Sequence, residues 1–137
     1  MAKVFTIDVI TPARKVLSVE AESIIIPSPQ GYLGILYNHA PLVTPLGGGV
    51  ITYKHKGEKG AIAVCGGFVE VSNNRVSIRA DTAECAWEID MERAKRAEER
   101  ARDRLRKKQA GIDTLRAELA LRRALARQHA AVVRGPM

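Results

Sequence analysis

The stretch Ile89-Asp90-Met91-Glu92-Arg93-Ala94 decides how this chain folds, because the sequence changes character around it. Its pattern, Ile-Asp-x-x-Arg-Ala, returns once, as Ile112-Asp113-Thr114-Leu115-Arg116-Ala117. In each copy the Asp stands where a helix N-cap belongs, and its carboxylate can accept hydrogen bonds from the N–H groups of the first turn. The preceding Ile can pack on the Ala at the fourth helical position. The repeat therefore predicts two helix starts.

The C-terminal segment, residues 86–137, is rich in Ala, Glu and Arg and reads as two helices. We expect the first helix over residues 90–108 and the second over residues 113–133. The break between them is Gln109-Ala110-Gly111-Ile112, whose glycine suits a helix C-cap. With so short a link, the two helices either fold back as an antiparallel hairpin or extend apart.

The two expected helices differ in their supply of large apolar side chains. The candidate apolar stripe of the first is mostly alanine, and the second has leucines; the stripes are Ala94, Ala97, Ala101 and Leu105, and Leu115, Leu119, Leu121 and Leu125. A stripe of alanines buries little area in each turn. We therefore expect the hairpin to be only marginally stable by itself.

The N-terminal segment, residues 1–85, alternates short apolar runs with Gly, Pro and Asn, which is typical of strands and turns. The dipeptide Asn73-Asn74 suits a two-residue hairpin turn, because Asn tolerates positive φ. A longer turn is expected at Lys56–Gly60. The expected strands are Phe5–Val9, Ile24–Ile26 (stopping at Pro27), Val50–His55, Ala61–Cys65, Phe68–Val71 and Val76–Ala80.

These patterns predict an α+β protein, with an N-terminal antiparallel β-sandwich or barrel in residues 1–85 and a C-terminal antiparallel helical hairpin in residues 86–137. The length of 137 residues suits one domain, or one small domain with an appendage. The chain shows neither an apolar run long enough to span a bilayer nor a signal-peptide pattern. We expect Cys65 and Cys85 to be reduced thiols in a cytosolic protein.

Positive charge is concentrated in the C-terminal third. Residues 1–87 hold 8 Lys/Arg and 7 Asp/Glu, whereas residues 88–137 hold 14 and 8. The net charge of +7 therefore lies almost wholly in the helical segment, which should seek acidic surfaces, phosphates or nucleic acid.

Several ordered motifs carry a family resemblance over essentially the whole chain. The segment Gly31–Leu42 (GYLGILYNHAPL) is similar to "GELGILPGHAPL", and Gly66–Val71 is similar to "GGFLEV". Val9–Pro12 matches the early strand and turn, and Ala117–Leu121 (AELAL) a helical motif. The chain thus resembles the epsilon subunit of bacterial F-type ATP synthases.

The resemblance implies a non-catalytic rotor subunit, peripheral on the cytoplasmic face of the cell membrane, that helps couple proton flow to ATP synthesis. Its sandwich would dock on the gamma subunit and on the ring of membrane c subunits. Its helices would switch between a compact hairpin and an extended form that reaches the catalytic beta and alpha subunits and opposes ATP hydrolysis. Arg116, Arg122 and Arg123 are the expected contacts to beta, whereas we expect Arg127 and Arg134 on a solvated helix face.

The ring contact implied by the resemblance lies in the segment starting at Gly31. Its candidates are Gly31, Tyr32, Leu33 and His39. The chain departs from the family here, because Tyr32 replaces a Glu and Tyr37-Asn38 replace Pro-Gly, although Asn38 can adopt the positive φ of the glycine. The alternative is a glycine-rich sandwich loop without a partner, which leaves the exposed Tyr32 and His39 unexplained.

In a subset of these subunits the motif at the start of the first helix binds ATP and favours the compact form. Arg93 and Arg100 are seven residues apart, hence on one face and ~10.5 Å apart along the helix. Folding back around residues 110–111 would place Arg100 opposite Leu121 to Arg123 and Arg116 opposite Leu105, gathering four arginines around a triphosphate. Because phosphate repels the Asp90 carboxylate, Asp90 would instead accept a hydrogen bond from the adenine amino group. The resemblance implies Glu84 as a further candidate at the adenine end.

The expected ATP ligands are Glu84, Ile89, Asp90, Arg93, Ala94, Arg100, Arg116 and Arg123. ATP, alone or with Mg, would be a regulatory ligand, and we expect no catalytic residue, catalytic cofactor or resident metal, since a Walker-type loop is missing from the sequence. The alternative is that Asp90 is a plain N-cap and the arginines are solvated.

Three other function classes compete with the rotor subunit. A nucleic-acid binder would need aromatic side chains on the basic helices, yet Trp87 is the last aromatic of the chain. An enzyme would have to use His39, His55 and His129, which are scattered and lack a nucleophile–base arrangement. A freestanding ATP sensor would work without partners. The motifs favour the rotor subunit and no nucleic-acid partner.

Overall fold

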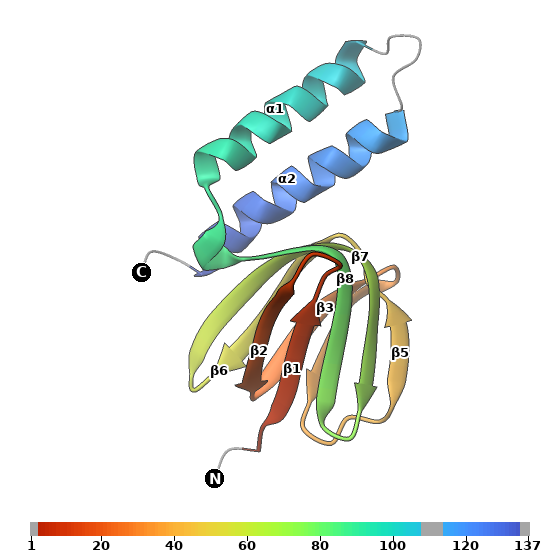
Figure 1. Ribbon diagram of the computed structural model, residues 1–137, viewed down its shortest axis with the longest axis vertical. Coiled ribbons are helices and arrows are strands. Elements are labelled where there is room, and N and C mark those ends of the chain that lie inside the picture. The colour runs from red at the N-terminus through yellow and green to blue at the C-terminus, as the bar shows by residue number, and fades with distance from the viewer. Residues whose placement is uncertain (1–2, 108–113, 135–137) are drawn as a thin grey trace.

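The fold has two parts, a β-sandwich formed by eight strands and a hairpin of two α-helices that stands on one end of it (Figure 1). The computed structural model describes residues 3–107 and 114–134, with side chains as far as Val132. In this part of the chain the elements are β1 (Phe5–Ile10), β2 (Lys15–Ala21), β3 (Ser23–Ser28), β4 (Gly31–Leu36), β5 (Leu42–Pro45), β6 (Gly49–His55), β7 (Glu58–Ser72), β8 (Arg75–Cys85), η1 (Ala86–Glu88), α1 (Met91–Lys107) and α2 (Thr114–Arg134).

The strands form one sheet in the order β2-β1-β8-β7-β6-β3-β4, with β5 added along β7. The long strand β7 pairs with β6 in its first half and with β5 in its second. Between the halves, Gly66 and Gly67 have φ of +76° and +104°, and a Cβ on Gly67 would meet the Arg79 carbonyl oxygen at 1.9 Å. Only glycine fits this bend, which lets the sheet fold over on itself.

The sandwich core is formed by the inward faces of the strands. In β1, for example, Phe5, Ile7 and Val9 are buried while Thr6 and Asp8 are half-buried, as expected of a strand with one face in the core. The largest fully buried side chains of the molecule belong to this core: Ile7, Val9, Ile24, Ile26, Ile35, Ile51, Ile62, Val64, Val69, Val76, Ile78 and Cys85.

Most predicted strands are present, but their limits differ. The two strands expected at residues 61–65 and 68–71 are one strand, β7, because its glycines bend the chain without ending it. The strand predicted to stop at Pro27 continues through it. Strand β3 pairs with β6 only as far as Ile25, and at Pro27 it pairs with β4 alone. Proline has no N–H, but on the β6 side no strand is present at Pro27 to accept a hydrogen bond from it.

Three further features were not predicted. Strands β2, β4 and β5 have no strong alternation in sequence, and β4 lies in the segment also considered as a loop. The turn expected at Lys56–Gly60 is shorter and consists of Lys56 and Gly57. The other predicted turn is confirmed, since Asn73 and Asn74 both have positive φ. One strand pair, β1 with β8, is parallel, because both strands run toward the helices.

The helices match the predicted ranges closely, and their packing uses alanine rather than leucine. In α1 the buried residues are Ala94 and Ala101. In α2 the predicted leucine stripe is half right: Leu119 and Leu121 are half-buried, but Leu115 is 64% and Leu125 40% exposed, and the fully buried side chains are Ala117, Ala124, Ala126 and Ala130. Small side chains allow a close approach of the helices.

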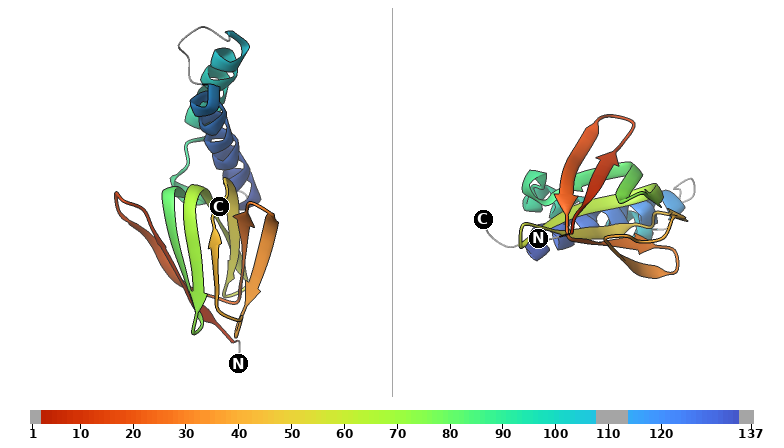
Figure 2. Two further views of the ribbon diagram at one scale, coloured as in Figure 1. Left: turned by 90° about the vertical axis from the view of Figure 1, so that its right-hand side faces the viewer. Right: turned by 90° about the horizontal axis from the view of Figure 1, so that it is seen from below.

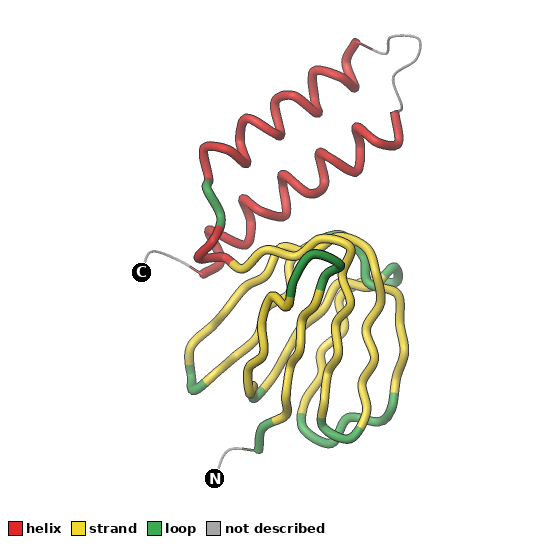
Figure 3. The backbone as a smooth tube through the Cα atoms, viewed as in Figure 1, coloured by secondary structure: helices red, strands yellow, loops and turns green. Residues whose placement is uncertain are grey.

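The helices contact the sandwich through a second, small apolar cluster. It combines Ala126 and Ala130 of α2 with Val50, Ala61 and Ala63 of the sheet and Ala86 of the linker, which we define as residues 86–90 between β8 and α1. Ile89 of the linker packs against this cluster. Figure 2 shows the hairpin edge-on, extending beyond the sandwich, and Figure 3 shows strands and helices in separate regions. Thus α2 rests on the sheet and α1 packs against α2.

Candidate functional site

The first Ile-Asp-x-x-Arg-Ala motif begins α1 as predicted. The Asp90 carboxylate accepts a hydrogen bond from the Arg93 N–H at 3.2 Å, and the Asp90 carbonyl accepts one from the Ala94 N–H at 3.0 Å. These bonds satisfy two N–H groups of the first turn, so Asp90 is an N-cap. In the second motif Ile112 and Asp113 lie outside the described residues, and α2 begins at Thr114.

A cleft of about 190 Å³ lies where the linker, α1 and α2 meet. Strand β8 contributes one carboxylate and the linker two, α1 contributes two arginines and two alanines, and α2 contributes one arginine. The lining residues are Glu84, Glu88, Asp90, Arg93, Ala94, Ala97, Arg100 and Arg127. Five of these residues, Glu84, Asp90, Arg93, Ala94 and Arg100, were predicted from the sequence to meet around one ligand.

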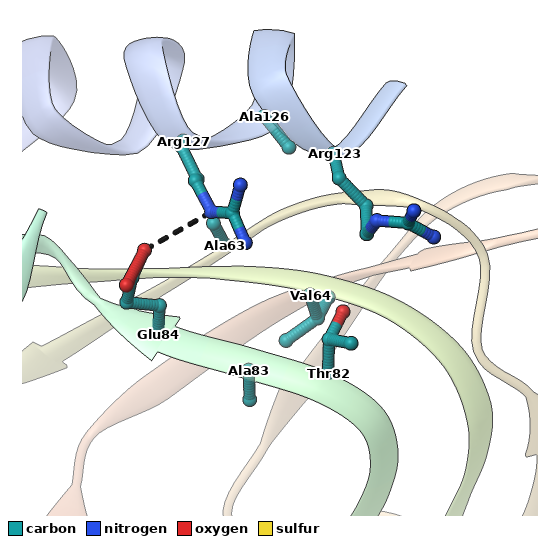
Figure 4. Close-up of a pocket in the computed structure, with 8 residues that line it drawn as sticks. All are labelled: Ala63, Val64, Thr82, Ala83, Glu84, Arg123, Ala126 and Arg127. Atoms are coloured by element: carbon teal, nitrogen blue, oxygen red, sulfur yellow. Dashed lines mark ion pairs between the residues drawn. The ribbon is translucent and has the colours of Figure 1, made fainter. Parts of the chain in front are cut away.

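Arg127 lines this cleft, although the sequence analysis placed it on a solvated face. Its guanidinium forms an ion pair with Glu84 at 3.1 Å, with both side chains about one-third exposed (Figure 4). At 100° per residue, Arg127 lies between the Ala126–Ala130 side of α2, which faces the sheet, and the opposite side with Ala124. Arg127 thus points into the angle between the sheet and α1. The side chain of Arg134 lies outside the described part.

Arg123, a predicted ligand, lies on the other side of that ion pair. It lines a smaller cavity of about 80 Å³ against the sheet, together with Thr82, Ala83, Ala126 and the Glu84–Arg127 pair, above Ala63 and Val64 (Figure 4). The two cavities therefore share Glu84 and Arg127. The pair separates Arg123 from Arg93 and Arg100.

Arg116 does not line this cleft, contrary to the predicted geometry. Gln128 donates a hydrogen bond to Glu98 across the helices at 2.8 Å, so residues of α1 and α2 face each other around a midpoint at residue 113 rather than 110–111. This shift moves Arg100 opposite residue 126 instead of residues 121–123. Arg116 is eleven residues from Arg127, about 16 Å along α2 toward the closed end of the hairpin.

Ile89, also predicted to touch the ligand, packs instead against the alanine cluster under α2. Its side chain is half-buried, whereas the neighbouring residues Glu88 and Asp90 line the cleft. Ile89 therefore fixes the linker to the sheet and α2.

Glu88 is held by two donors from the sandwich. Its carboxylate accepts hydrogen bonds from the Arg14 guanidinium at 3.0 Å and from the Cys85 N–H at 3.1 Å. The hydrogen bond from Arg14 is the main reason why the pKa of Glu88 lies below its usual range, with partial burial opposing the shift. The negative charge of Glu88 is therefore already balanced by Arg14 of the sandwich.

The charges of the cleft suit a ligand with an anionic end and a hydrogen-bonding end. Within the described residues Arg93 and Arg100 form no ion pair, so both guanidinium groups can bind an incoming phosphate. Of the carboxylates, Glu88 and Asp90 lie just before α1, whereas Glu84 pairs with Arg127 of α2. A volume of about 190 Å³ is below the ~300 Å³ of a usual ligand pocket. A nucleotide would therefore extend into solvent or toward the neighbouring cavity.

The sequence missed Glu88, Ala97 and Arg127 as lining residues. Ala97 could have been included, since it lies on the face of α1 shared by Arg93 and Arg100. Arg127 follows Arg123 by one helical turn, and that spacing was available as a signal. The contribution of Glu88 depends on Arg14, which is 74 residues away, and no local pattern indicates it.

The residues predicted to contact the membrane ring lie at two ends of β4. Gly31, Tyr32 and Leu33 begin the strand, and Tyr32 is 62% exposed with its hydroxyl beside Gly49. His39 follows the far end, about 17 Å from Gly31 at the usual rise of a strand. There Asn38, with φ of +62° as expected, pairs with Asn74 of the β7–β8 turn. The structure does not bring His39 and Tyr32 together.

The arginines predicted to contact the beta subunit also divide between faces of α2. Arg116 and Arg123 are seven residues apart and share one face, whereas Arg122 is exposed on another. The three histidines are likewise far apart in sequence and fold; His55 binds the Glu20 carbonyl and His39 the Ala40 carbonyl. Among the described residues, neither Cys65 nor Cys85 forms a disulfide. No helix in the described residues has the length and apolar character that a bilayer crossing requires.

Comparison with known proteins identifies both parts of the fold. Residues 4–86 match the family described as "ATP synthase, Delta/Epsilon chain, beta-sandwich domain", and residues 88–131 match "ATP synthase, Delta/Epsilon chain, long alpha-helix domain". The chain is 52% identical over 126 residues to the ATP synthase epsilon chain of Moorella thermoacetica, covering 91% of this chain and 94% of that one. It is 51% identical over 131 residues to the ATP synthase epsilon chain of Desulfitobacterium hafniense strain Y51, covering 96% of this chain and 98% of that one.

A solved structure shares the fold. A chain in the cryo-EM structure of the Euglena gracilis mitochondrial ATP synthase superposes with a TM-score of 0.77 and 24% identity, covering 95% of this chain and 82% of that chain. The family matches span the sandwich and the helices, and the bacterial relatives are matched over nearly their whole length. This chain therefore belongs to the delta/epsilon family of the F-type ATP synthase as an epsilon chain, a non-catalytic subunit of that enzyme.

Proposed function

We propose that this epsilon chain regulates its ATP synthase by binding ATP in the cleft between the linker, α1 and α2. The observation that supports the proposal most directly is that five residues selected from sequence motifs line one cleft. In this proposal Arg93, Arg100 and Arg127 hold the phosphates, and Asp90 accepts a hydrogen bond from the adenine amino group. The nucleotide is bound without being hydrolysed, alone or with Mg.

Ligand binding would favour the compact hairpin, because the cleft has walls from both helices. A ligand that binds only one of two conformations stabilises that conformation by mass action. Inverting a population from 1:99 to 99:1 requires about 5.5 kcal/mol of differential binding free energy. Four charge-assisted hydrogen bonds at ~1.5 kcal/mol each, or two at ~3 kcal/mol each, supply this. Three arginines converging on one phosphate chain are enough.

Arg127 would exchange partners when ATP binds. In the compact form it pairs with Glu84 at 3.1 Å, and both groups are partly exposed, so the pair itself adds little stability. A triphosphate carries more charge than one carboxylate and can draw Arg127 away. Opening the pair would also join the two cavities and give the ligand access to Arg123.

The wider role follows the family. We propose that the sandwich docks on the gamma subunit and the c ring of the rotor, peripheral to the membrane, and that the helices in their extended form reach the catalytic alpha and beta subunits and oppose ATP hydrolysis. The separation of Tyr32 from His39 along β4 means that one flat ring surface cannot contact both. The end with Tyr37, Asn38 and His39 lies away from the helices and is the better candidate for the ring.

Calorimetric titration of ATP into the isolated chain tests the binding proposal. We expect the unaltered protein to bind one ATP, and an Arg93→Ala, Arg100→Ala variant to bind at least tenfold more weakly because two charge-assisted contacts are lost. The matched control is Arg104→Ala, Arg106→Ala, which removes the same charge from the same helix outside the cleft. Equal loss in both variants, or no binding by the unaltered protein, contradicts a specific site.

A further inference from the structure

The turn between β1 and β2 reaches the nucleotide cleft through one side chain. Arg14 ends this turn, and its guanidinium contacts both oxygens of Glu88, at 3.0 and 2.9 Å. The turn itself is fixed, because the Thr11 hydroxyl oxygen accepts from the Ala13 and Arg14 N–H groups at 3.3 Å. Arg14 is therefore presented to the linker by the sandwich.

Glu88 in turn lies at the edge of the cleft, where its charge matters. The cleft is lined by three arginines and three carboxylates, so its formal charge is zero. A triphosphate brings about four negative charges into this space, and each uncompensated carboxylate within the Debye length opposes it. Before ATP binds, Arg127 pairs with Glu84, whereas Arg14 pairs with Glu88 from outside the cleft and does not have to leave it for the phosphates.

We propose that Arg14 is a positioning residue for nucleotide affinity, which acts by holding and neutralising the Glu88 carboxylate at the edge of the cleft. This inference rests on the proposed function, and it adds to the site a residue of the sandwich that does not touch the ligand. Without Arg14, Glu88 keeps only the hydrogen bond from the Cys85 N–H, and its negative charge at the edge of the cleft has no cationic partner. The sandwich then takes part in setting how tightly the helices hold ATP.

Arg14 could affect ATP binding by anchoring the linker or by neutralising Glu88, and these two roles predict different effects of Glu88→Gln. If the pair only anchors the linker, removing either partner should weaken binding, and Glu88→Gln should act like Arg14→Ala. If the pair neutralises charge, Glu88→Gln removes the repulsive group itself. It should then leave ATP affinity unchanged or raised, and it should cancel the effect of Arg14→Ala.

The experiment is a double-mutant cycle on the full chain, with ATP affinity measured by calorimetry at low ionic strength. We expect Arg14→Ala to weaken ATP binding about three- to tenfold, as befits a partly exposed charge pair. We expect Arg14→Lys to stay close to the unaltered protein, and Arg14→Ala, Glu88→Gln to match Glu88→Gln. Arg75→Ala, which removes the Arg75–Asp8 ion pair of the sandwich, is the control and should not change affinity.

The ligand series gives a second readout. The effect of Arg14→Ala should shrink from ATP to ADP and vanish for adenosine, because the repulsion acts on phosphate charge; loss of adenosine binding would instead indicate a disturbed linker and overturn the proposal. An unaltered protein that binds ATP while Arg14→Ala binds equally well also overturns it. Absence of ATP binding by the unaltered protein contradicts the proposed function itself.

Discussion

Asp90 combines a structural and a proposed ligand role in one carboxylate. One oxygen caps α1 by accepting the Arg93 N–H, while the same side chain lines the cleft beside Arg93 and Arg100. The N-cap role was readable from sequence because it depends only on neighbours within three residues. The two roles can be separated, since a hydroxyl also caps a helix but carries no charge.

We predict that Asp90→Ala destabilises the protein by about 1 kcal/mol through loss of the cap. Asp90→Ser should keep most of that stability but still lose ATP affinity, because a hydroxyl is a poorer acceptor for an amino group than a carboxylate. Urea unfolding followed by circular dichroism measures the first effect, and calorimetry the second. If Ser and Ala were equally unstable, the cap assignment would be wrong.

Cleft residues that are close together in sequence were predicted correctly, whereas those on α2 were not. Glu84, Asp90, Arg93, Ala94 and Arg100 lie within 17 consecutive positions, so helix geometry alone fixes most of their relations. Arg116, Arg123 and Arg127 depend on how α2 slides along α1. That register depends on where the chain turns back, and an error of two or three residues there moved Arg127 into the cleft and Arg116 out of it.

At the scale of elements, the contact between α1 and α2 depends on one polar bridge and a set of alanines. Glu98 accepts hydrogen bonds from Gln128 of α2 and from Arg102 of its own helix, at 2.8 and 2.6 Å. The bond from Gln128 is the main cause that lowers the pKa of Glu98, with Arg102 next. The bridge thus favours the ionised carboxylate in the hairpin.

The pH dependence of the hairpin follows from this direction. A carboxyl with a lowered pKa in the folded state stabilises it fully above its ordinary value of 4.5, and that stabilisation is lost as the pH falls below 4.5 toward the folded-state pKa. We expect energy transfer between dyes on α1 and α2 to report opening in this acid range. Glu98→Gln should flatten the transition, whereas Glu99→Gln, one residue away on the exposed side, should leave it unchanged.

The alanine packing of the helices was not predicted, because a hydrophobicity pattern ranks leucine above alanine regardless of the available space. In the structure Ala101 is 1% and Ala124 0% exposed, while Leu115 is 64% exposed. Close packing selects by volume in such a contact, so alanines are fully buried there while Leu119 and Leu121 are only half-buried. The strands show the converse case: β1 and β3 were predicted because their large apolar residues do fill the core.

Filling the alanine contact should therefore separate the helices. We predict that Ala124→Leu destabilises the hairpin by about 1–3 kcal/mol through overpacking. Leu125→Ala, at the next position and 40% exposed, should cost about 1 kcal/mol or less. Urea unfolding followed by helical circular dichroism makes the comparison. A larger loss for Leu125→Ala would mean that the leucine face, and not the alanine face, holds the hairpin.

At the scale of the whole molecule, the sandwich and the hairpin are joined by little apolar surface. The large buried side chains belong to the sandwich core, whereas the apolar contact of α2 with the sheet and the linker consists of Val50, Ile89 and alanines. At ~25 cal/mol per Å² such small side chains contribute little. Release of the hairpin from the sheet can therefore occur without unfolding the sandwich, which is the property a switching subunit requires.

This arrangement predicts how the assembled enzyme should respond to ATP. If the cleft regulates the enzyme as proposed, inhibition of ATP hydrolysis should weaken as ATP rises in an ATP synthase reconstituted with the unaltered epsilon chain, because bound ATP would favour the compact hairpin. With Arg93→Ala, Arg100→Ala, inhibition should persist to at least tenfold higher ATP, following the weaker binding. With Arg104→Ala, Arg106→Ala the dependence should match the unaltered enzyme. An inhibition independent of both ATP and the cleft arginines would mean that the cleft does not control the helices, even if it binds nucleotide.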